Sequence, residues 1–418
     1  MTEQMVNERW ILDDGVPIDL NQDVLVDGWL HQLMLVFNKP ALWPLWKVVW
    51  VMFLGIGVVA LVWGLLASGV VAALSLFSLM AIFTFTDALW LISLPRREIS
   101  FGSWQAQLFV FAVPRLAIAF VLGVAGLFVD WTICLGVTAV IQLIGTILLW
   151  YGTAVEPFNL SLTTLTVTTD RLPPDSEPIR ILHITDLHVE YLTKREAQVL
   201  DIVKATDADL VVISGDFVNL SNNRDPKTLA QVHDLLSQIE APYGVYAVLG
   251  SPPVDLRETI PPLFADLPIE LMRGEWRKIA MGNGRYLTII GMDFTHNLPV
   301  DRERMTKLAQ AAPQDAPQLL LAHSPEIMPE AAEQGIDLYL CGHTHGGQVR
   351  LPFLGPLLTS SQLGRRFVMG FYKIGRTHLY ISRGIGLEGL SAPRVRFLCP
   401  PEMTLVTVTK PTPPTLPI

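Results

Sequence analysis

Residues 338–347 read Leu-Tyr-Leu-Cys-Gly-His-Thr-His-Gly-Gly, and they are the most informative stretch of the chain. The four apolar residues at 338–341 predict a short strand that is buried on both faces. Gly342 allows a sharp turn directly after this strand, and the turn presents His343 and His345. Two imidazoles at the end of a buried strand are candidate metal ligands.

The same pattern, a buried strand followed by polar side chains, occurs three more times upstream. The side chains in question are Asp186 and His188, then Asp216, then His323. Because the carboxyl ends of parallel strands form one rim of a sheet, we expect all six side chains to converge there. Carboxylates and imidazoles without a thiolate suit Mn, Fe, Zn or Ni. The sequence therefore predicts two neighbouring divalent metal ions.

The overall composition indicates that part of the chain lies in lipid. Half of its 418 residues are hydrophobic, and the mean hydropathy of +0.40 is high for a soluble protein of this length. The formal charge of -9, with no basic run, argues against a nucleic-acid partner. Three cysteines without paired spacing argue against a disulfide framework.

Four apolar stretches are long enough to cross a bilayer. They cover approximately residues 48–66, 70–94, 108–128 and 131–150. Among the short segments that flank these stretches, only the one before the first stretch and the one between the second and third carry Lys or Arg, so both should be cytoplasmic. An even number of spans then returns the C-terminal domain to the cytoplasm. We therefore predict an integral membrane protein with a cytoplasmic C-terminal domain.

Two charged residues, Asp87 and Arg115, lie inside the apolar spans. Each is about two helical turns from the loop that joins the second and third spans, which places both at similar depth. We predict an ion pair between them, because an unpaired charge within a bilayer is costly. The alternative is that both side chains extend to the membrane interface.

From about residue 156 the chain alternates between strand and helix patterns. The predicted helices cover residues 194–206, 227–239, 302–311 and 325–334, and the part after residue 367 is rich in strands. This alternation predicts sheets with helices on their outer faces. We expect four parts: an N-terminal cytoplasmic or interfacial segment (1–42), a four-span domain (43–155), a soluble domain (156–409) and a disordered tail (410–418). Residues 25–37 fit either a surface-lying amphipathic helix or a helix that caps the soluble domain.

The order of the metal-ligand motifs resembles that of the calcineurin-like metallophosphoesterase superfamily. The family pattern is Asp-x-His, Gly-Asp, Gly-Asn-His-Asp/Glu, His and Gly-His-x-His, and the resemblance spans approximately residues 181–408. Residues 342–352, 364–366 and 382–384 are similar to the membrane-associated bacterial branch. The resemblance implies a location in a bacterial cell membrane. It also implies α-helical membrane hairpins followed by an α/β domain, a two-sheet sandwich flanked by helices (αββα).

The resemblance also implies which residues bind each metal. Asp186, His188, Asp216 and His345 would hold the first ion, and Asp216 would bridge to a second ion completed by His323 and His343. A water activated by both ions would attack phosphorus. Asp216 and His343 are thus the implied catalytic residues, in their role as metal-site residues.

One motif departs from the family pattern, since Gly250-Ser251-Pro252-Pro253 stands in place of Gly-Asn-His-Asp/Glu. Ser251 replaces an asparagine ligand of the second metal, which makes it a doubtful ligand. Pro252 replaces a histidine that protonates the leaving group, and the loss of a general acid costs about 10²- to 10⁴-fold in rate. The candidate replacement acids are Asp255, Asp293 and His296.

These patterns together predict a membrane-anchored, metal-dependent phosphoesterase that hydrolyses a phosphate ester or pyrophosphate. Its partners would be the bilayer and an amphiphilic, lipid-linked substrate, whose anionic head group could meet Arg350, Arg365, Arg366 or Arg383. The altered loop motivates an alternative, a catalytically degraded module that binds metal and a phosphorylated ligand. A transporter with a regulatory soluble domain is supported only by the charges within the spans.

Overall fold

The structure is a computed structural model that describes residues 36, 39–99, 102–388 and 394–411. The chain divides into two compact units. Among the described residues, the helical unit consists of residues 36, 39–99, 102–156, 388 and 394–395, and the sheet unit consists of residues 157–387 and 396–411. Most of the predicted helix at 25–37 and of the predicted tail at 410–418 lies outside the described residues.

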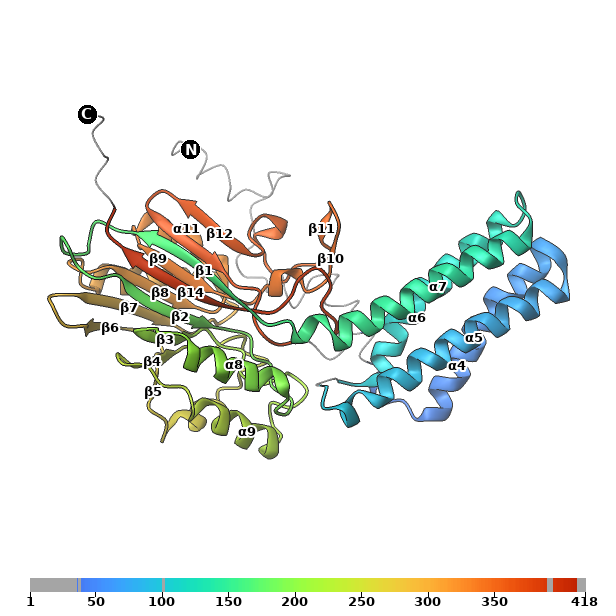
Figure 1. Cartoon of the computed structure of the whole chain (residues 1–418), viewed down its shortest axis with the longest axis horizontal. Helices are drawn as coiled ribbons and strands as arrows, with labels where there is room; N and C mark the ends of the chain where they lie inside the picture. Colours follow the sequence, from blue (N-terminus) through green and yellow to red (C-terminus); the bar gives the residue numbers. More distant parts are fainter. Residues whose placement is uncertain (1–35, 37–38, 100–101, 389–393, 412–418) are drawn as a thin grey trace, which may run out of the picture. The chain divides into compact units, whose positions relative to one another are not determined.

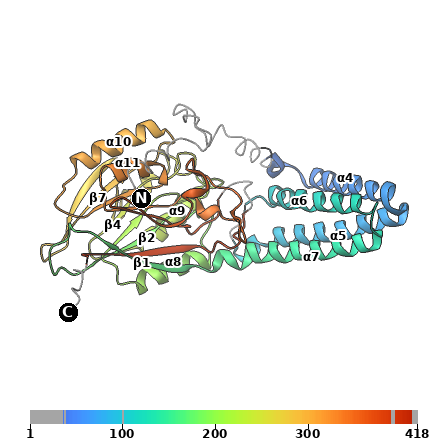
Figure 2. The same cartoon turned by 90° about the horizontal axis from the view of Figure 1, so that it is seen from above.

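The helical unit contains four helices that are long and apolar enough to cross a membrane. They are α4 (Leu45–Trp63), α5 (Val70–Ser93), α6 (Trp104–Ala125) and α7 (Trp131–Ala154). A short helix at Lys39–Leu42 precedes α4, one at Gly64–Ser68 lies between α4 and α5, and one at Pro95–Arg97 lies between α5 and α6. In Figure 2, α4 runs beside α6 and α5 runs beside α7. Helix α6 starts at Trp104, earlier than the predicted start near residue 108, because the Ser103 hydroxyl accepts a hydrogen bond from the Ala106 N–H and caps the helix.

A buried polar cluster joins three of these helices. The Arg115 guanidinium on α6 lies 2.7 Å from the Asp87 carboxylate on α5, and both side chains are buried. The Thr146 hydroxyl on α7 donates to Asp87 at 2.8 Å and accepts from Arg115 at 3.1 Å. The predicted ion pair is confirmed, and neither side chain extends to solvent.

The sheet unit contains two six-stranded sheets. The first has the order β1 (Ser161–Thr168), β14 (Glu402–Thr409), β2 (Ile179–Ile184), β3 (Leu210–Ile213), β4 (Val245–Ala247) and β5 (Ile269–Leu271). The second has the order β12 (Gly370–Ile374), β13 (Thr377–Ile381), β9 (Leu338–Cys341), β8 (Gln318–Ala322), β7 (Tyr286–Met292) and β6 (Glu275–Ala280). Strands β2, β3 and β4 are parallel to one another, as are β7, β8 and β9.

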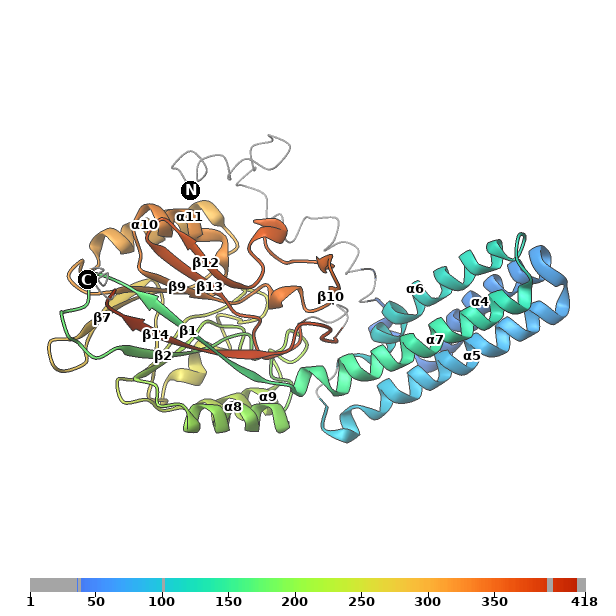
Figure 3. The same ribbon diagram turned by 45° about the horizontal axis from the view of Figure 1, so that its top comes forward.

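The sheets pack face to face, and alternation along each strand sends side chains to two different cores. On β2, Ile179 and Ile181 belong to the core between the sheets, whereas Leu182 and Ile184 face the outer core. Helices α8 (Lys194–Ala205) and α9 (Pro226–Leu236) cover this outer face (Figure 1). Helices α10 (Leu298–Ala311) and α11 (Met328–Glu333) cover the opposite sheet (Figure 3). The predicted αββα sandwich is therefore confirmed.

Several element boundaries differ from prediction. Helix α10 begins at Leu298 rather than near 302, because Asn297 caps it and Pro299 suits its first turn. Strand β12 begins at Gly370 rather than 367, and the Val368 carbonyl instead accepts a hydrogen bond from the Thr344 hydroxyl. Strands β5 and β6 and the two-residue strands β10 (Arg350–Leu351) and β11 (Gly355–Pro356) were not predicted. Apart from the buried Ile269 of β5 and Pro356 of β11, their residues are half-buried or exposed, which weakens the apolar alternation.

Candidate metal centre

The six predicted ligands come from the carboxyl ends of four strands, and the structure brings them into two groups. Asp186, His188 and His345 form the first group, and Asp216, His323 and His343 form the second. All six side chains are buried. Within each group, the candidate ligand atoms lie within 4.8 Å of one another.

The distances within the first group fit a shared ion. The Nε2 atoms of His188 and His345 lie 3.0 Å apart, and His345 Nε2 lies 3.6 Å from an Asp186 oxygen. Ligands about 2.1 Å from an ion are separated by approximately 3.0–3.5 Å from each other. These three side chains are therefore spaced as ligands of one metal.

The second group is equally compact and is joined to the first through Asp216. His323 Nε2 lies 3.1 Å from His343 Nδ1 and 3.3 Å from Asp216 Oδ2. The same Asp216 oxygen lies 3.4 Å from His188 Nε2 in the first group. One carboxylate between two ligand groups is the arrangement that a two-metal centre requires.

Five of the six ligands adopt the left-handed backbone conformation that non-glycine residues rarely take. The φ angles are 52° at Asp186, 43° at His188, 56° at Asp216, 70° at His343 and 49° at His345. This conformation costs free energy, and such strain is typical of functional sites held by the surrounding fold. It turns each side chain inward directly after its strand.

Close backbone packing makes this turn possible. A Cβ at Gly342 would lie 2.0 Å from an Asp186 carboxylate oxygen, and one at Gly250 would lie 2.1 Å from Asp216 Oδ1. No other residue fits at either position without displacing a ligand.

Hydrogen bonding and electrostatics also suit a cation. His323 Nδ1 lies 2.8 Å from the Ser214 carbonyl, so Nδ1 donates and Nε2 keeps its lone pair for a metal. Burial lowers the pKa of His323, but the Asp216 and Asp186 carboxylates and the hydrogen bond to the Ser214 carbonyl together raise this pKa to about 10. Burial lowers the pKa of His343 to about 3, which favours the neutral imidazole that a metal ion requires.

The altered loop at residues 250–253 still contributes to the second group. Ser251 Oγ lies 3.2 Å from His323 Nε2 and 3.4 Å from His343 Nδ1, and the Ser251 N–H donates to Asp216 at 2.7 Å. Ser251, which was predicted as a doubtful ligand, therefore lies within reach of the second group. Its hydroxyl is short and neutral, so it would hold a metal more weakly than a carboxylate.

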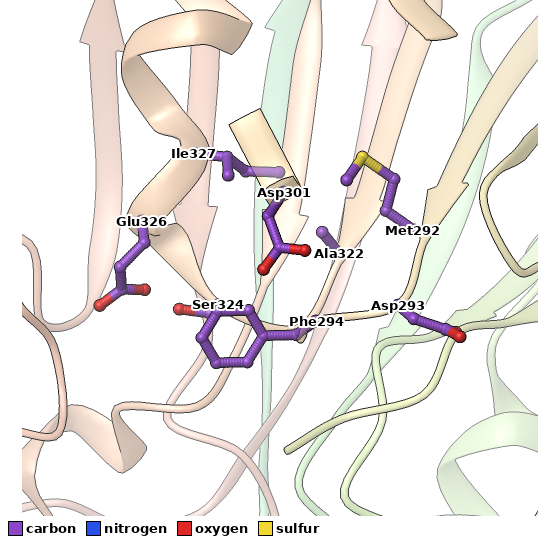
Figure 4. A pocket seen from close by; sticks show the side chains of 8 residues that line it. All are labelled: Met292, Asp293, Phe294, Asp301, Ala322, Ser324, Glu326 and Ile327. Carbon is purple, nitrogen blue, oxygen red and sulfur yellow. The ribbon is translucent and has the colours of Figure 1, made fainter. Parts of the chain in front are cut away.

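The three candidate acids differ in position. The Asp255 carboxylate is fully buried and accepts backbone N–H groups of Asp216, Phe217 and Gly250 at 2.7–3.0 Å. This geometry makes Asp255 an anchor for two ligand loops. Asp293 forms an ion pair with Arg273 at 2.9 Å and lines a small cavity (Figure 4). Neither carboxylate is placed as a proton donor above the metal groups.

His296 is placed differently. Its ring is half-buried, and its centroid lies 6.4 Å from that of the ligand His343. Phe294 packs edge-on against both rings. The preceding Thr295 is fixed by two hydrogen bonds to the buried Asp301 carboxylate, at 2.8 and 3.0 Å. His296 is therefore held at the edge of the second group.

Two further buried residues lie near the ligand groups. Arg396 was not predicted to have a role, and His183 was predicted to be a core residue. Arg396 is fully buried, lies 3.5 Å from His345 Nδ1 and donates to the carbonyls of Arg383, Gly384 and Gly386. It braces a loop against the first group, and nothing in its sequence surroundings indicated this role. His183, predicted to be a core residue, is fully buried with a hydrogen bond to Ser214, and burial lowers its pKa to about 3.

This geometry agrees with a comparison to known protein families. Residues 179–347, which contain all six ligands, match the calcineurin-like phosphoesterase family. The chain carries a calcineurin-like phosphoesterase domain. The match begins at the first residue of β2 and ends two residues after His345.

Relatives of the phosphoesterase domain occur in bacteria and in a mammal. The chain is 28% identical over 264 residues to the uncharacterized metallophosphoesterase YkuE of Bacillus subtilis, covering 62% of this chain and 88% of YkuE. It is 27% identical to phosphodiesterase YaeI of Escherichia coli over 56% of this chain and 83% of YaeI. It is 26% identical to a bovine transmembrane protein with metallophosphoesterase domain over 61% of this chain and 57% of that protein.

Proposed function

We propose that the protein is a membrane-anchored phosphoesterase that hydrolyses a phosphate ester or pyrophosphate at two divalent metal ions. The observation that carries this proposal is the position of Asp216, whose Oδ2 lies 3.4 Å from a histidine of one ligand group and 3.3 Å from a histidine of the other. The nitrogen and oxygen ligands suit Mn, Fe, Zn or Ni. When bound, the ions would acidify a water nucleophile and neutralise the phosphate oxygens.

The protein's own residues would orient this chemistry. Backbone N–H groups of Ser251 and His343 hold Asp216 and Asp186 in place, at 2.7 and 3.0 Å. The Asp255 carboxylate ties the loop after β3 to the loop after β4. Substrate binding therefore requires no rearrangement of the ligands, which favours stabilisation of the transition state.

The alternative, a degraded module that only binds metal and a phosphorylated ligand, is not favoured. All six candidate ligands lie in two compact groups, and Ser251 Oγ lies 3.2 Å from His323 Nε2 of the second group. Pro252 removes a proton donor but none of these groups, so substrates whose leaving group needs no proton should still react.

We test the proposal with the full chain in detergent, measuring metal content and hydrolysis of bis(p-nitrophenyl) phosphate with added Mn. Wild-type protein should bind about two ions and turn over this diester. Asp216→Asn replaces the shared carboxylate with a neutral amide and should lose metal and at least about 10³-fold in turnover. Lys227→Gln, at the exposed start of α9, serves as the matched control and should change neither.

Two outcomes would contradict the proposal. Wild-type protein that binds metal without turnover, combined with turnover in a Ser251→Asn/Pro252→His variant, would establish the degraded module. Full activity in Asp216→Asn would show that the two groups do not form the reaction centre.

A further inference from the structure

The β10–β11 hairpin and its following residues, 350–358, expose apolar side chains on the sheet unit. Phe353 is fully exposed, and Leu354 and Leu357 are 67% and 53% exposed. We call residues 350–358 the tip hairpin. Exposed apolar side chains concentrated on one loop mark an interaction surface.

The tip hairpin has a defined conformation. Arg350 pairs with Pro356 and Leu351 with Gly355. The Arg350 N–H donates to the Phe397 carbonyl at 2.9 Å, and the Leu357 N–H donates to the Val349 carbonyl at 3.0 Å. The backbone therefore fixes Phe353 and Leu354 at the turn, where they cannot fold back onto the core.

Two arginine guanidinium groups lie against the tip hairpin. Residues 338–387 contain no Asp or Glu, although the whole chain has a net charge of -9. The guanidinium groups of Arg350 and Arg365 both approach Gly355, and Arg365 donates to the Leu354 carbonyl. Arg366 is exposed beside them. Apolar side chains at a tip with arginines behind them match the interfacial region of an anionic bilayer.

The tip hairpin is hydrogen-bonded to the loop that carries two of the candidate metal ligands. It starts five residues after the ligand His345, and the Arg350 guanidinium donates to the Gly346 carbonyl at 2.8 Å. Just beyond its other end, the Ser360 hydroxyl donates to the carbonyl of the ligand His343 at 2.9 Å. Whatever the tip hairpin contacts is therefore brought close to the metal ligands.

The chain connection keeps a bilayer within reach of the sheet unit. Helix α7 ends at Ala154 and strand β1 begins at Ser161. A tether this short holds the sheet unit at high local concentration near any membrane that α7 crosses.

We propose that the tip hairpin inserts Phe353 and Leu354 into the acyl boundary of the bilayer, and that Arg350 and Arg365 bind head-group phosphates there. The metal centre then acts on phosphoesters whose acyl chains remain in that bilayer. This inference rests on the proposed membrane anchoring and phosphoesterase activity.

The first test measures insertion without relying on catalysis. A nitroxide spin label is attached at Phe353→Cys in the full chain, reconstituted in nanodiscs of phosphatidylcholine and phosphatidylglycerol. The three native cysteines are buried. The matched control label is at Val300→Cys, another exposed apolar position on α10. We expect the label at 353 to collide more with oxygen than with a water-soluble nickel chelate, and the label at 300 to show the reverse.

Two results of this measurement would overturn the inference. One is aqueous accessibility at position 353 equal to that at position 300. The other is a label shielded from both oxygen and nickel, which would indicate a protein contact. Loss of insertion in nanodiscs without phosphatidylglycerol, or in an Arg350→Gln/Arg365→Gln variant, would support the role of the arginines.

The second test compares two substrates with the same leaving group. One is soluble bis(p-nitrophenyl) phosphate, and the other is an acyl-chain p-nitrophenyl phosphodiester embedded in the nanodiscs. In Phe353→Ser/Leu354→Ser we expect kcat/KM to fall at least about ten-fold on the embedded diester and to stay unchanged on the soluble one. Equal rates of wild type and variant on both substrates would overturn the inference. Absence of hydrolysis by wild type would instead contradict the proposed function, and the spin-label result would still stand.

Discussion

Proline at position 252 leaves the phosphoesterase domain without a proton donor at a place where the family has histidine. Of the three candidate acids, only His296 lies beside the ligand groups with a half-buried ring, 6.4 Å from the His343 ring. Asp255 and Asp293 are instead occupied by backbone N–H groups and by Arg273. At the scale of single residues, His296 is the candidate for leaving-group protonation.

We expect His296→Ala to slow hydrolysis of an alkyl phosphodiester about 10²-fold, because an alkoxide leaves poorly without a proton. Hydrolysis of bis(p-nitrophenyl) phosphate should not change, because p-nitrophenolate leaves unprotonated. Steady-state kinetics on both diesters measure this difference. His233→Ala, on α9, serves as the control and should affect neither substrate. An unchanged alkyl-ester rate in His296→Ala would exclude this residue.

A second residue, Glu326, should make stability depend on pH. Burial raises its pKa to about 7, and hydrogen bonds from Ser361 and the Gln362 N–H lower it only partly. It lines the small cavity of Figure 4, and its Oε2 has no hydrogen-bond partner among the described residues. The folded-state pKa lies above the unfolded-state value, so folding is favoured most while Glu326 is protonated. The contribution of protonated Glu326 to the free energy of unfolding is therefore complete below about pH 4.5 and is lost as the pH rises through about 7.

We therefore expect Glu326→Gln to flatten the pH dependence of the thermal unfolding midpoint. Wild-type stability should fall relative to the variant between about pH 5 and pH 8, by at most about 3 kcal/mol. Thermal unfolding of both proteins at the two pH values measures the difference. Identical pH dependence in both proteins would show that ionisation of Glu326 does not destabilise the folded state.

At the scale of elements, α5, α6 and α7 are joined by the ion pair of Asp87 and Arg115 and by the Thr146 hydroxyl. Either single substitution to alanine leaves a charge buried without its partner, whereas the double substitution removes both charges. We expect the double variant to be more stable than the sum of the single effects predicts, by about 1–3 kcal/mol.

This coupling can be measured by a double-mutant cycle of thermal or denaturant unfolding in detergent. Thr86→Ala, an exposed position one residue before Asp87, serves as the control and should show no coupling to Arg115→Ala. Additive effects of Asp87→Ala and Arg115→Ala would contradict a stabilising ion pair.

At the scale of the whole molecule, the positions of Lys and Arg in the short loops predict a cytoplasmic phosphoesterase domain. Protease added to spheroplasts, in which the cell membrane is exposed but sealed, should leave this domain uncut. Protease added after lysis of the spheroplasts should cleave it. Protection can be read with an antibody to a C-terminal tag. Cleavage in intact cells would reverse the orientation and place the metal centre outside.

Local patterns in the sequence were enough to predict the four long apolar helices, sheets covered by helices, and the six Asp and His side chains that the structure brings into two groups. An apolar run of sufficient length predicts a long apolar helix, and a buried strand followed by Asp or His predicts a ligand at a strand end. Both features depend on residues that are close in sequence. Strands such as β6 and β10 were missed because their own residues alternate only weakly between apolar and polar. Pairing with a neighbouring strand, rather than their local sequence, makes them strands.

Only the tertiary structure decided how these residues combine. It placed Asp216 between two ligand groups, made Asp255 an anchor of two loops, set Arg396 against His345 and exposed Phe353 at a turn. Each of these outcomes depends on contacts between segments far apart in the chain. Such contacts follow from the packing of two sheets, which no local pattern contains.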